Sequence, residues 1–564
     1  MSDTVAIGPS DLLAVRALTA SLWVSPQLTE ADMADAARAG FRTIIDNRPD
    51  GEEPGQLSAA EMERLAARHG MAFAHVPVVP GKIGDADVAR MADLLSRLNA
   101  PILAYCRTGA RSTSLWALAQ AGSMPVETIL KTAANAGYDL AALRPRLELA
   151  AAIPEHVPPA RAAIVIVGGG SAGLATAASL LKRDRTLDVI VIEPRTEHDY
   201  QPGWTMVGAG VFDAKETRRP EASAMPAGVR WIKSTVASFA PHDNAVTLED
   251  GSTVGYRALV VAPGIALDWA AIDGLTDTLG RNGVTSNYSY ATAPYTWELV
   301  QALKGGTALF TQPPMPIKCA GAPQKAMYLS CDHWRRHDVL NDIAVQFHNA
   351  GAVLFGVKEF VPPLMKYVDR YGIDLRFDST LVAVDGPNRT ATFREKNGEV
   401  TTSFDMFHVT PPQKAPTFVA QSPLANEAGY VDVDQATLQH VRYANVFGLG
   451  DGGSTPNAKT MAAARKQAPI VAENLLAVLA GKTPTALYDG YGSCPLTVER
   501  GKILLAEFGY GGKLLPSFPS WIIEGTKPQR LSWLLKAEAL PWLYWNGMLK
   551  GREWMARPAH REPA

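Results

Sequence analysis

Short apolar runs alternate with amphipathic stretches over the first part of the chain. Residues 62–70 and 112–122 carry apolar side chains at helical spacing. Three runs have the length and composition of buried strands: residues 41–46, 74–79 and 101–106. The alternation predicts an α/β domain over residues 1–145, and the Pro- and Ala-rich stretch 146–162 is typical of a linker.

A second α/β pattern begins at Ala163. Residues 163–167 form an apolar strand-like run, a glycine turn follows, and the next residues are apolar at helical spacing. This pattern continues over residues 163–485, which we interpret as one domain. The remaining region, residues 486–564, is dense in Trp, Leu, Tyr and Pro with scattered basic residues. The predicted fold class is therefore α/β throughout, with a distinct C-terminal region.

The glycine turn of the second domain has the spacing of a nucleotide site. Gly168, Gly170 and Gly173 form a GxGxxG pattern, which lets backbone approach a pyrophosphate at a helix N-terminus. The next strand, DVIVIEP, ends at Glu193, where a carboxylate suits a ribose diol. The order of these elements, a strand, a glycine turn, a helix and a second strand that ends in an acidic residue, favours a dinucleotide site. A chance glycine-rich turn would not be expected to show that order.

Charge, cysteine count and hydrophobic patterning argue against several other classes of function. A formal net charge of −2 argues against a nucleic-acid partner. Four cysteines in 564 residues indicate no disulfide framework and fit a reducing compartment. The N-terminal sequence lacks the features of a secretory signal, and we find no clean apolar run of about 18 residues, so no membrane-spanning helix is expected. We predict no metal site.

Two later stretches favour FAD as the dinucleotide. RALVVAPG (257–264) and NVFGLGD (445–451) resemble strands of two-dinucleotide-domain flavoproteins, similar to glutathione reductase. That resemblance implies that Gly450 and Asp451 lie at the FAD pyrophosphate and ribityl chain. A nicotinamide site is not expected, because PPMPIKCAGAPQK replaces the second glycine pattern after the strand GTALFTQ.

Cys319 lies just before a predicted helix. Lys318 and Lys325 are close in sequence, and both the cations and a helix N-terminus favour thiolate over thiol. A thiolate beside a flavin suits a redox role. A small buried cysteine is the alternative that this stretch alone leaves open.

Longer motifs resemble the sulfide:quinone oxidoreductases of the mitochondrial type. They include HDYQPGWTMVGAG (198–210), IKCAGAPQKAMYLS (317–330), LYDGYGSCPL (487–496) and LSWLLKAEALPWLYWNGMLKGREW (531–554). The resemblance implies FAD, sulfide as donor, a quinone as acceptor and two redox cysteines. Cys319 matches the first. The second is expected after Asp451, but Gly452 stands there.

The remaining cysteines offer no obvious replacement. Cys331 follows Cys319 by twelve residues, about 18 Å along a helix and beyond disulfide reach. Cys494 is not expected to be a catalytic position on the resemblance, and its distance from the flavin cannot be read from the sequence. Three hypotheses follow: a one-cysteine sulfide oxidase, an oxidase of a thiol or persulfide, or a flavin-binding sensor. A quinone reductase with NADH or another donor and a phosphatase-like regulatory domain is a further alternative.

The first domain carries its own cysteine loop, CRTGARS. Four residues separate Cys106 from Arg111, one fewer than in protein tyrosine phosphatases, and the short loop resembles that of rhodanese-type sulfurtransferases. Similar domains are fused to persulfide-dioxygenase-like proteins. We therefore favour sulfane-sulfur transfer by Cys106 with Arg111 assisting, over a phosphatase or a structural thiol. Asp46 or Asp50 could act as a phosphatase acid, although turn roles suit both.

The aromatic C-terminal region predicts contact with a membrane. Residues 527–552 interleave Trp, Leu and Tyr with basic residues, as in helices that lie in a bilayer interface, and Pro541 should separate two helical pieces. A packed hairpin or a dimer contact is the alternative, and homo-oligomers stay open. Lys459, in the NAKT turn, is a candidate contact to flavin or quinone. We expect a peripheral enzyme on the cytoplasmic face of the inner membrane.

Overall fold

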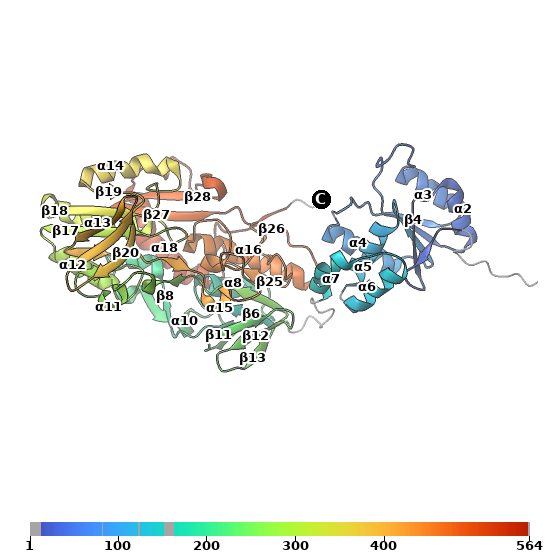
Figure 1. The fold of residues 1–564 in the computed structure, drawn as a ribbon, viewed down its shortest axis with the longest axis horizontal. Coiled ribbons are helices and arrows are strands. Elements are labelled where there is room, and N and C mark those ends of the chain that lie inside the picture. Colours follow the sequence, from blue (N-terminus) through green and yellow to red (C-terminus); the bar gives the residue numbers. More distant parts are fainter. Residues whose placement is uncertain (1–12, 82, 122–123, 152–162, 562–564) are drawn as a thin grey trace, which may run out of the picture. The chain divides into compact units, whose positions relative to one another are not determined.

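The computed structural model describes residues 13–81, 83–121, 124–151 and 163–561. The chain divides into two compact units, Met1–Val157 and Pro158–Ala564 (Figure 1). Each unit has its own sheets and its own buried clusters of apolar side chains. The fold is mixed α/β, as the sequence predicts.

Unit 1 is built on one five-stranded sheet. The strand order is β1 (Arg16–Ala17), β2 (Leu22–Ser25), β5 (Ile102–Tyr105), β3 (Thr43–Asp46) and β4 (Ala72–His75). Only the β1–β2 pair is antiparallel. Strands β3 and β5 are buried along their whole length, so helices must cover both faces of the sheet.

Two groups of helices supply that cover. Helices α2 (Glu30–Arg38) and α3 (Ala59–Arg68) pack on one face, where Ile44 and Leu103 lie. Helices α4 (Asp85–Arg97), α5 (Ala110–Gln120) and α6 (Val126–Asn135) pack on the other face with Ile45. Alternate residues of each strand thus serve the two cores. Helix α5 begins directly after β5, which places the Cys106 loop at the carboxyl end of the sheet.

The predicted linker begins later than the sequence suggests. Residues 144–151 form helix α7 (Arg144–Ala151), whose Leu147 is fully buried in the unit 1 core. The apolar residues of RPRLELAA therefore complete unit 1, although their Ala- and Pro-rich composition is typical of a connection. The rest of the predicted linker, residues 152–162, lies outside the described residues.

Unit 2 contains two five-stranded parallel sheets. The first has the order β10 (Val229–Ile232), β7 (Asp188–Ile192), β6 (Ala163–Val167), β14 (Ala258–Val261) and β25 (Val446–Gly448). The second has the order β16 (Val284–Thr285), β23 (Met406–His408), β17 (Gly306–Gln312), β18 (Ile343–Asn349) and β19 (Asp374–Arg376). Two such sheets in one unit are the arrangement expected for a two-dinucleotide-domain flavoprotein.

Two helices pack beside the first sheet. Helix α8 (Ser171–Arg183) follows β6 across the glycine turn, and α16 (Met461–Leu479) packs against α8 in the same core cluster. Beside the second sheet, helix α13 (Ala322–Arg336) contacts a hairpin formed by β27 (Gly492–Glu499) and β28 (Lys502–Phe508). This contact joins segments that are far apart in the sequence.

The C-terminal region belongs to unit 2 and does not form a separate domain. Helix α17 (Arg530–Leu534) continues through a π-helical turn (Leu535–Ala539) into α18 (Leu540–Asn546). Tyr544 and Trp545 are buried in the core cluster that contains α8. Pro541 does not separate two pieces as predicted, because the π turn before it widens the helix where proline removes an N–H and crowds the preceding turn.

Candidate active site

The glycine turn after β6 has no room for larger residues. Gly168 has φ +101°, and a Cβ placed on it would lie 2.4 Å from the Ala262 carbonyl oxygen. A Cβ on Gly173 would lie 1.9 Å from the Gly168 carbonyl oxygen. A Cβ on Gly170 would meet nothing within 4 Å. The turn is therefore tight on its protein side and open at the N-terminus of α8, which fits a bound pyrophosphate.

Glu193 is fixed beside this turn by backbone donors. Its Oε2 accepts a hydrogen bond from the Gly169 N–H at 2.7 Å, and its Oε1 accepts one from the Arg195 N–H at 2.9 Å. Glu193 also lines the cavity over the turn. The carboxylate is thus held where a ribose diol of a dinucleotide would need it.

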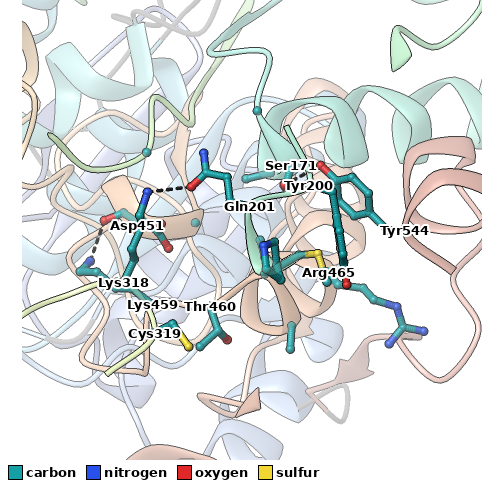
Figure 2. A pocket seen from close by; sticks show the side chains of 18 of the residues that line it. Ser171, Tyr200, Gln201, Lys318, Cys319, Asp451, Lys459, Thr460, Arg465 and Tyr544 are labelled. Atoms are coloured by element: carbon teal, nitrogen blue, oxygen red, sulfur yellow. Dashed lines mark hydrogen bonds between the residues drawn. The ribbon is translucent and has the colours of Figure 1, made fainter. Parts of the chain in front are cut away.

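One cavity of about 610 Å³ joins the predicted site residues of unit 2. Figure 2 shows Cys319, Lys318, Asp451 and Lys459 on one side of it, and Ser171 and Tyr544 on another. The predicted residues on its wall are Gly168, Gly170, Glu193, Cys319, Gly450, Asp451 and Lys459. Gly173 lies behind the wall, where it lets α8 approach β6.

Asp451 and Lys459 follow β25 and line the cavity. Lys459 Nζ donates hydrogen bonds to the carbonyl oxygens of Asp451, at 2.7 Å, and Gly453, at 2.9 Å. Burial lowers the pKa of Lys459 to about 8, against the opposing effect of Asp451. Burial also raises the pKa of the Asp451 carboxyl. The turn itself needs Gly450, whose φ is +71°.

Cys319 occupies a constrained loop between β17 and α13. Its φ of +51° lies in the left-handed region, which is rare for residues other than glycine. The Cys319 N–H donates to the Lys459 carbonyl oxygen at 2.8 Å, and the Tyr288 hydroxyl donates to the Lys318 carbonyl oxygen at 3.0 Å. These contacts hold the sulfur at the cavity wall, where strained backbone conformations often mark functional positions.

A second sulfur atom lies beside Cys319. Cys494 Sγ, on β27, is 3.5 Å from Cys319 Sγ, and Lys325 Nζ donates to Cys319 Sγ at 3.0 Å. A hydrogen bond from Cys494 and the charge of Lys325 lower the pKa of Cys319 well below its usual value, although burial opposes them. The bond to Cys319, together with burial, raises the pKa of Cys494. These shifts favour a thiolate on Cys319 over one on Cys494.

This geometry gives Cys319 a sulfur neighbour within unit 2, which the sequence did not identify. The position after Asp451 is Gly452, where a Cβ would lie 3.1 Å from the Gly264 carbonyl oxygen. Cys331 is buried within α13, and burial raises the pKa of its thiol. The neighbouring sulfur instead comes from the SCPL stretch, 175 positions after Cys319. The available signal was that Cys494 lies within LYDGYGSCPL, one of the stretches that carry the family resemblance.

Two further lysines flank the cysteine pair. Lys318 Nζ donates to Gln201 Oε1 at 2.7 Å, as Figure 2 shows, and burial lowers the pKa of Lys318. Lys536 comes from the π turn, and burial together with the charge of Lys325 lowers its pKa to about 7. The surroundings of the two sulfur atoms thus include the cation of Lys325 and the amine of Lys536, whose pKa is lowered to about 7.

The cysteine loop of unit 1 has a different environment. The Gly109 N–H donates to Cys106 Sγ at 3.2 Å, and Gly109 has φ +87° at the start of α5. Arg111 donates to the Val78 carbonyl oxygen at 2.7 Å and to Glu52 at 2.8 Å. The hydrogen bond from Arg111 is also the main cause that lowers the pKa of Glu52. The Cys106 sulfur therefore accepts a hydrogen bond from the backbone, while the Glu52 carboxylate accepts one from the guanidinium of Arg111.

The two aspartates of this loop region have structural contacts. Asp46 accepts a hydrogen bond from the Arg48 N–H at 2.8 Å, and burial raises the pKa of Asp46. Asp50 accepts one from the Ala59 N–H, at the start of α3, at 2.7 Å. These bonds favour the interpretation of both residues as turn and helix-start residues.

Family comparisons divide the chain in the same way. Residues 14–123 match the family described as beta-lactamase hydrolase-like protein, phosphatase-like domain. Residues 162–295 match the pyridine nucleotide-disulphide oxidoreductase family. A beta-lactamase hydrolase-like protein of Agrobacterium fabrum is 32% identical to this chain over a matched region. That region covers 24% of this chain and 32% of the Agrobacterium protein.

Fold and site together define a two-dinucleotide-domain flavoprotein with Cys319 at the cavity wall and Cys494 beside it. A mitochondrial sulfide:quinone oxidoreductase of Dictyostelium discoideum is 42% identical over 69% of this chain and 86% of its own length. The corresponding mouse protein is 38% identical over the same shares. The chain therefore belongs to the sulfide:quinone oxidoreductase family.

A solved structure supports the fold assignment. The sulfide:quinone oxidoreductase of Aquifex aeolicus superimposes with a TM-score of 0.56 at 19% identity, covering 68% of this chain and 92% of that one. FAD is the cofactor of this family, and the tight glycine turn, the open α8 N-terminus and Glu193 fit it.

Proposed function

We propose that unit 2 oxidises sulfide and passes the electrons to a quinone, with Cys319 and Cys494 as its redox pair. The observation that carries the proposal is the 3.5 Å separation of the two sulfur atoms beside the cavity that holds the glycine turn. A disulfide needs about 2.05 Å, so a small movement of either side chain brings the sulfur atoms within bonding distance, and removal of two electrons then forms the bond.

The pair has the asymmetry that such a reaction needs. In the oxidised state, HS⁻ attacks the Cys494 sulfur of a Cys319–Cys494 disulfide. The S–S bond breaks, Cys494 keeps the added sulfur as a persulfide, and Cys319 leaves as a thiolate. Cys319 is the better leaving group, because the charge of Lys325, whose Nζ lies 3.0 Å from its sulfur, favours the thiolate.

The cycle closes when an acceptor thiolate removes the outer sulfur from Cys494. Two thiolates then remain, and their oxidation by two electrons restores the disulfide. Bound FAD supplies that two-electron oxidation, and the quinone is the final acceptor. Lys325 is buried next to both sulfur atoms. Its charge compensates for the negative charge that each thiolate step leaves behind.

A test compares three serine variants in the full chain. Cys319→Ser and Cys494→Ser should each slow reduction of the flavin by sulfide by more than about 1,000-fold, because each removes half of the pair. Cys331→Ser is the matched control, since Cys331 is buried in α13 away from the cavity. Stopped-flow absorbance under anaerobic conditions measures the rate. Flavin reduction at the wild-type rate in Cys494→Ser would contradict the two-cysteine proposal.

The quinone is proposed to reach the cavity from a membrane surface. Exposed apolar side chains gather on the C-terminal segment, including Leu531, Leu534 and Trp542. Within the described residues, no helix is long and apolar enough to span a bilayer. We therefore propose a peripheral protein that rests its C-terminal helices on the inner membrane, with sulfide as the small substrate.

Unit 1 is proposed to carry sulfane sulfur on Cys106. The Gly109 N–H already points at that sulfur, which suits a terminal persulfide. Arg111 is proposed to assist Cys106, because its guanidinium, which forms an ion pair with Glu52, is a cation beside the loop. The acceptor thiolate of the cycle above would then be Cys106, or a small thiol that later meets it.

Phosphate-ester hydrolysis is the second candidate for unit 1, because the matching family is described as phosphatase-like. The carboxylate of Glu52 on Arg111 disfavours it, since a phosphate dianion would have to displace that contact. Turnover of an aryl phosphate that disappears in Cys106→Ser would favour the phosphatase.

A further inference from the structure

The N-terminus of helix α8 is held by a residue from the far end of the chain. Ser171, the first residue of α8, has its Oγ 2.8 Å from the hydroxyl of Tyr544 in α18. Tyr544 is 1% exposed, and both residues line the cavity. Figure 2 shows this hydrogen bond directly beneath the start of α8. Ser171 belongs to the glycine turn, so Tyr544 bears on the predicted pyrophosphate site.

A buried chain of hydrogen bonds fixes the Tyr544 hydroxyl. His198 Nε2 lies 2.6 Å from it, and His198 Nδ1 lies 3.0 Å from Glu221 Oε2. The side chains of His198 and Glu221 are each 2% exposed. The tautomer of His198 sets which atom donates in each of these hydrogen bonds, and the hydroxyls of Ser171 and Tyr544 can donate either way.

The same C-terminal segment holds the other end of α8. Arg183 and Ser179 both donate to Glu553, and Arg183 also donates to Glu473 of α16 at 2.5 Å. Burial opposes ionisation of Glu553, but Arg183 and Ser179 lower its pKa overall. A Cβ on Gly551 would lie 2.6 Å from the Ala178 carbonyl oxygen, so the backbones approach closely.

We propose that residues 540–553 act as a strap that positions α8 for FAD, with Tyr544 as a positioning residue acting through Ser171. The strap contacts α8 at its first residue and at its last turn, and packs against it between them. A helix whose N-terminal N–H groups must face a pyrophosphate loses affinity if its first turn shifts. The proposal rests on FAD binding by unit 2, and is independent of sulfide as the substrate.

The test measures FAD affinity without any turnover. Full-length protein is stripped of flavin, and FAD is titrated back while its fluorescence is followed. Tyr544→Phe keeps the ring and removes the hydroxyl, and the dissociation constant should rise about tenfold, the scale of one buried hydrogen bond. Tyr371→Phe is the control, because its buried hydroxyl donates to Val498 in the other core. That control should change the constant by less than about twofold.

A double-substitution cycle separates positioning from general packing. If Tyr544 acts through Ser171, Ser171→Ala and Tyr544→Phe should not add, and the double variant should bind FAD like the weaker single variant. Additive effects, or a Tyr544→Phe affinity within about twofold of wild type, would overturn the proposal. If Tyr544→Phe does not fold, Glu553→Gln carries the test at the far end of α8. Weaker FAD binding is then expected, and unchanged binding would overturn the proposal.

Discussion

Cys319 shows how neighbours from distant segments set the chemistry of one sulfur atom. Lys325 reaches it from the first turn of α13, and Cys494 reaches it from a hairpin near the C-terminus. Both lower the pKa of Cys319, although burial alone would raise it. The strained backbone at this residue keeps the sulfur at the cavity wall.

Removing the cation should move the pH dependence of the reaction. The folded pKa of Cys319 is depressed, so the thiolate is present above that pKa and is lost as the pH falls through it. In Lys325→Met the pKa rises, and the acid limb of sulfide-dependent flavin reduction should shift to higher pH. At any pH below the raised pKa, the thiolate fraction and with it the rate should fall roughly tenfold for each further pH unit. Stopped-flow rates across a pH series measure it.

Lys325→Arg is the matched control for that experiment. It retains a positive charge at the same position, so its acid limb should stay closer to that of the wild type. An acid limb that does not move in Lys325→Met would mean that Lys325 does not set the charge state of Cys319.

At this scale the sequence predicts local features well and long-range contacts poorly. The glycines at 168, 170 and 173 and the carboxylate of Glu193 belong to one strand–turn–helix–strand unit, so their spacing already contains their geometry. Cys494 meets Cys319 only because the β27–β28 hairpin packs on α13. No local pattern encodes that packing.

The C-terminal helical segment has one buried side and one exposed side. One side buries Tyr544 and Trp545 in the core, and the other exposes Leu534 and Trp542. Its periodic aromatic residues suggested an interfacial helix, yet the same pattern suits a helix that packs on the protein. Shortening the chain near Thr526 would therefore remove buried core as well as the exposed face, so loss of lipid association in a shortened chain would not be informative.

Point changes on the exposed face give the sharper test of membrane contact. The triple change Leu531→Ser, Leu534→Ser and Trp542→Ser should lower partition onto anionic vesicles by about tenfold or more, because it removes exposed apolar area while the buried side remains. Co-sedimentation with vesicles measures the partition. Val353→Ser, at an equally exposed apolar residue in the loop after β18, is the control. Equal partition of the triple variant and the wild type would contradict membrane docking.

At the scale of the whole molecule, two units carry two sulfur sites. Unit 1 places Cys106 at the carboxyl end of its sheet, and unit 2 places Cys319 at a cavity wall with Cys494 beside it. The fold class of both units was predictable from the alternation of strands and helices. Helix α7 and the C-terminal strap were not, because their packing partners lie elsewhere in the sequence.

The proposed sulfur hand-off can be separated from electron transfer. In Cys106→Ser, quinone reduction with a small thiol acceptor present should equal that of the wild type, since the cysteine pair is intact. Without that acceptor, the wild type should complete one more turnover per molecule than Cys106→Ser before it stalls, because Cys106 can take one sulfur from Cys494. Radioactive sulfide should label unit 1 only in the wild type. Labelling of unit 1 in Cys106→Ser would place the carried sulfur on another residue.

The strap on α8 has a consequence for living cells. If residues 540–553 settle properly only when the nucleotide helix is in place, a freshly made chain without flavin leaves its C-terminus loose. Proteases attack loose chain ends first. Riboflavin shortage should then appear as a lower abundance of the protein, and the molecules that survive would be those already loaded with flavin.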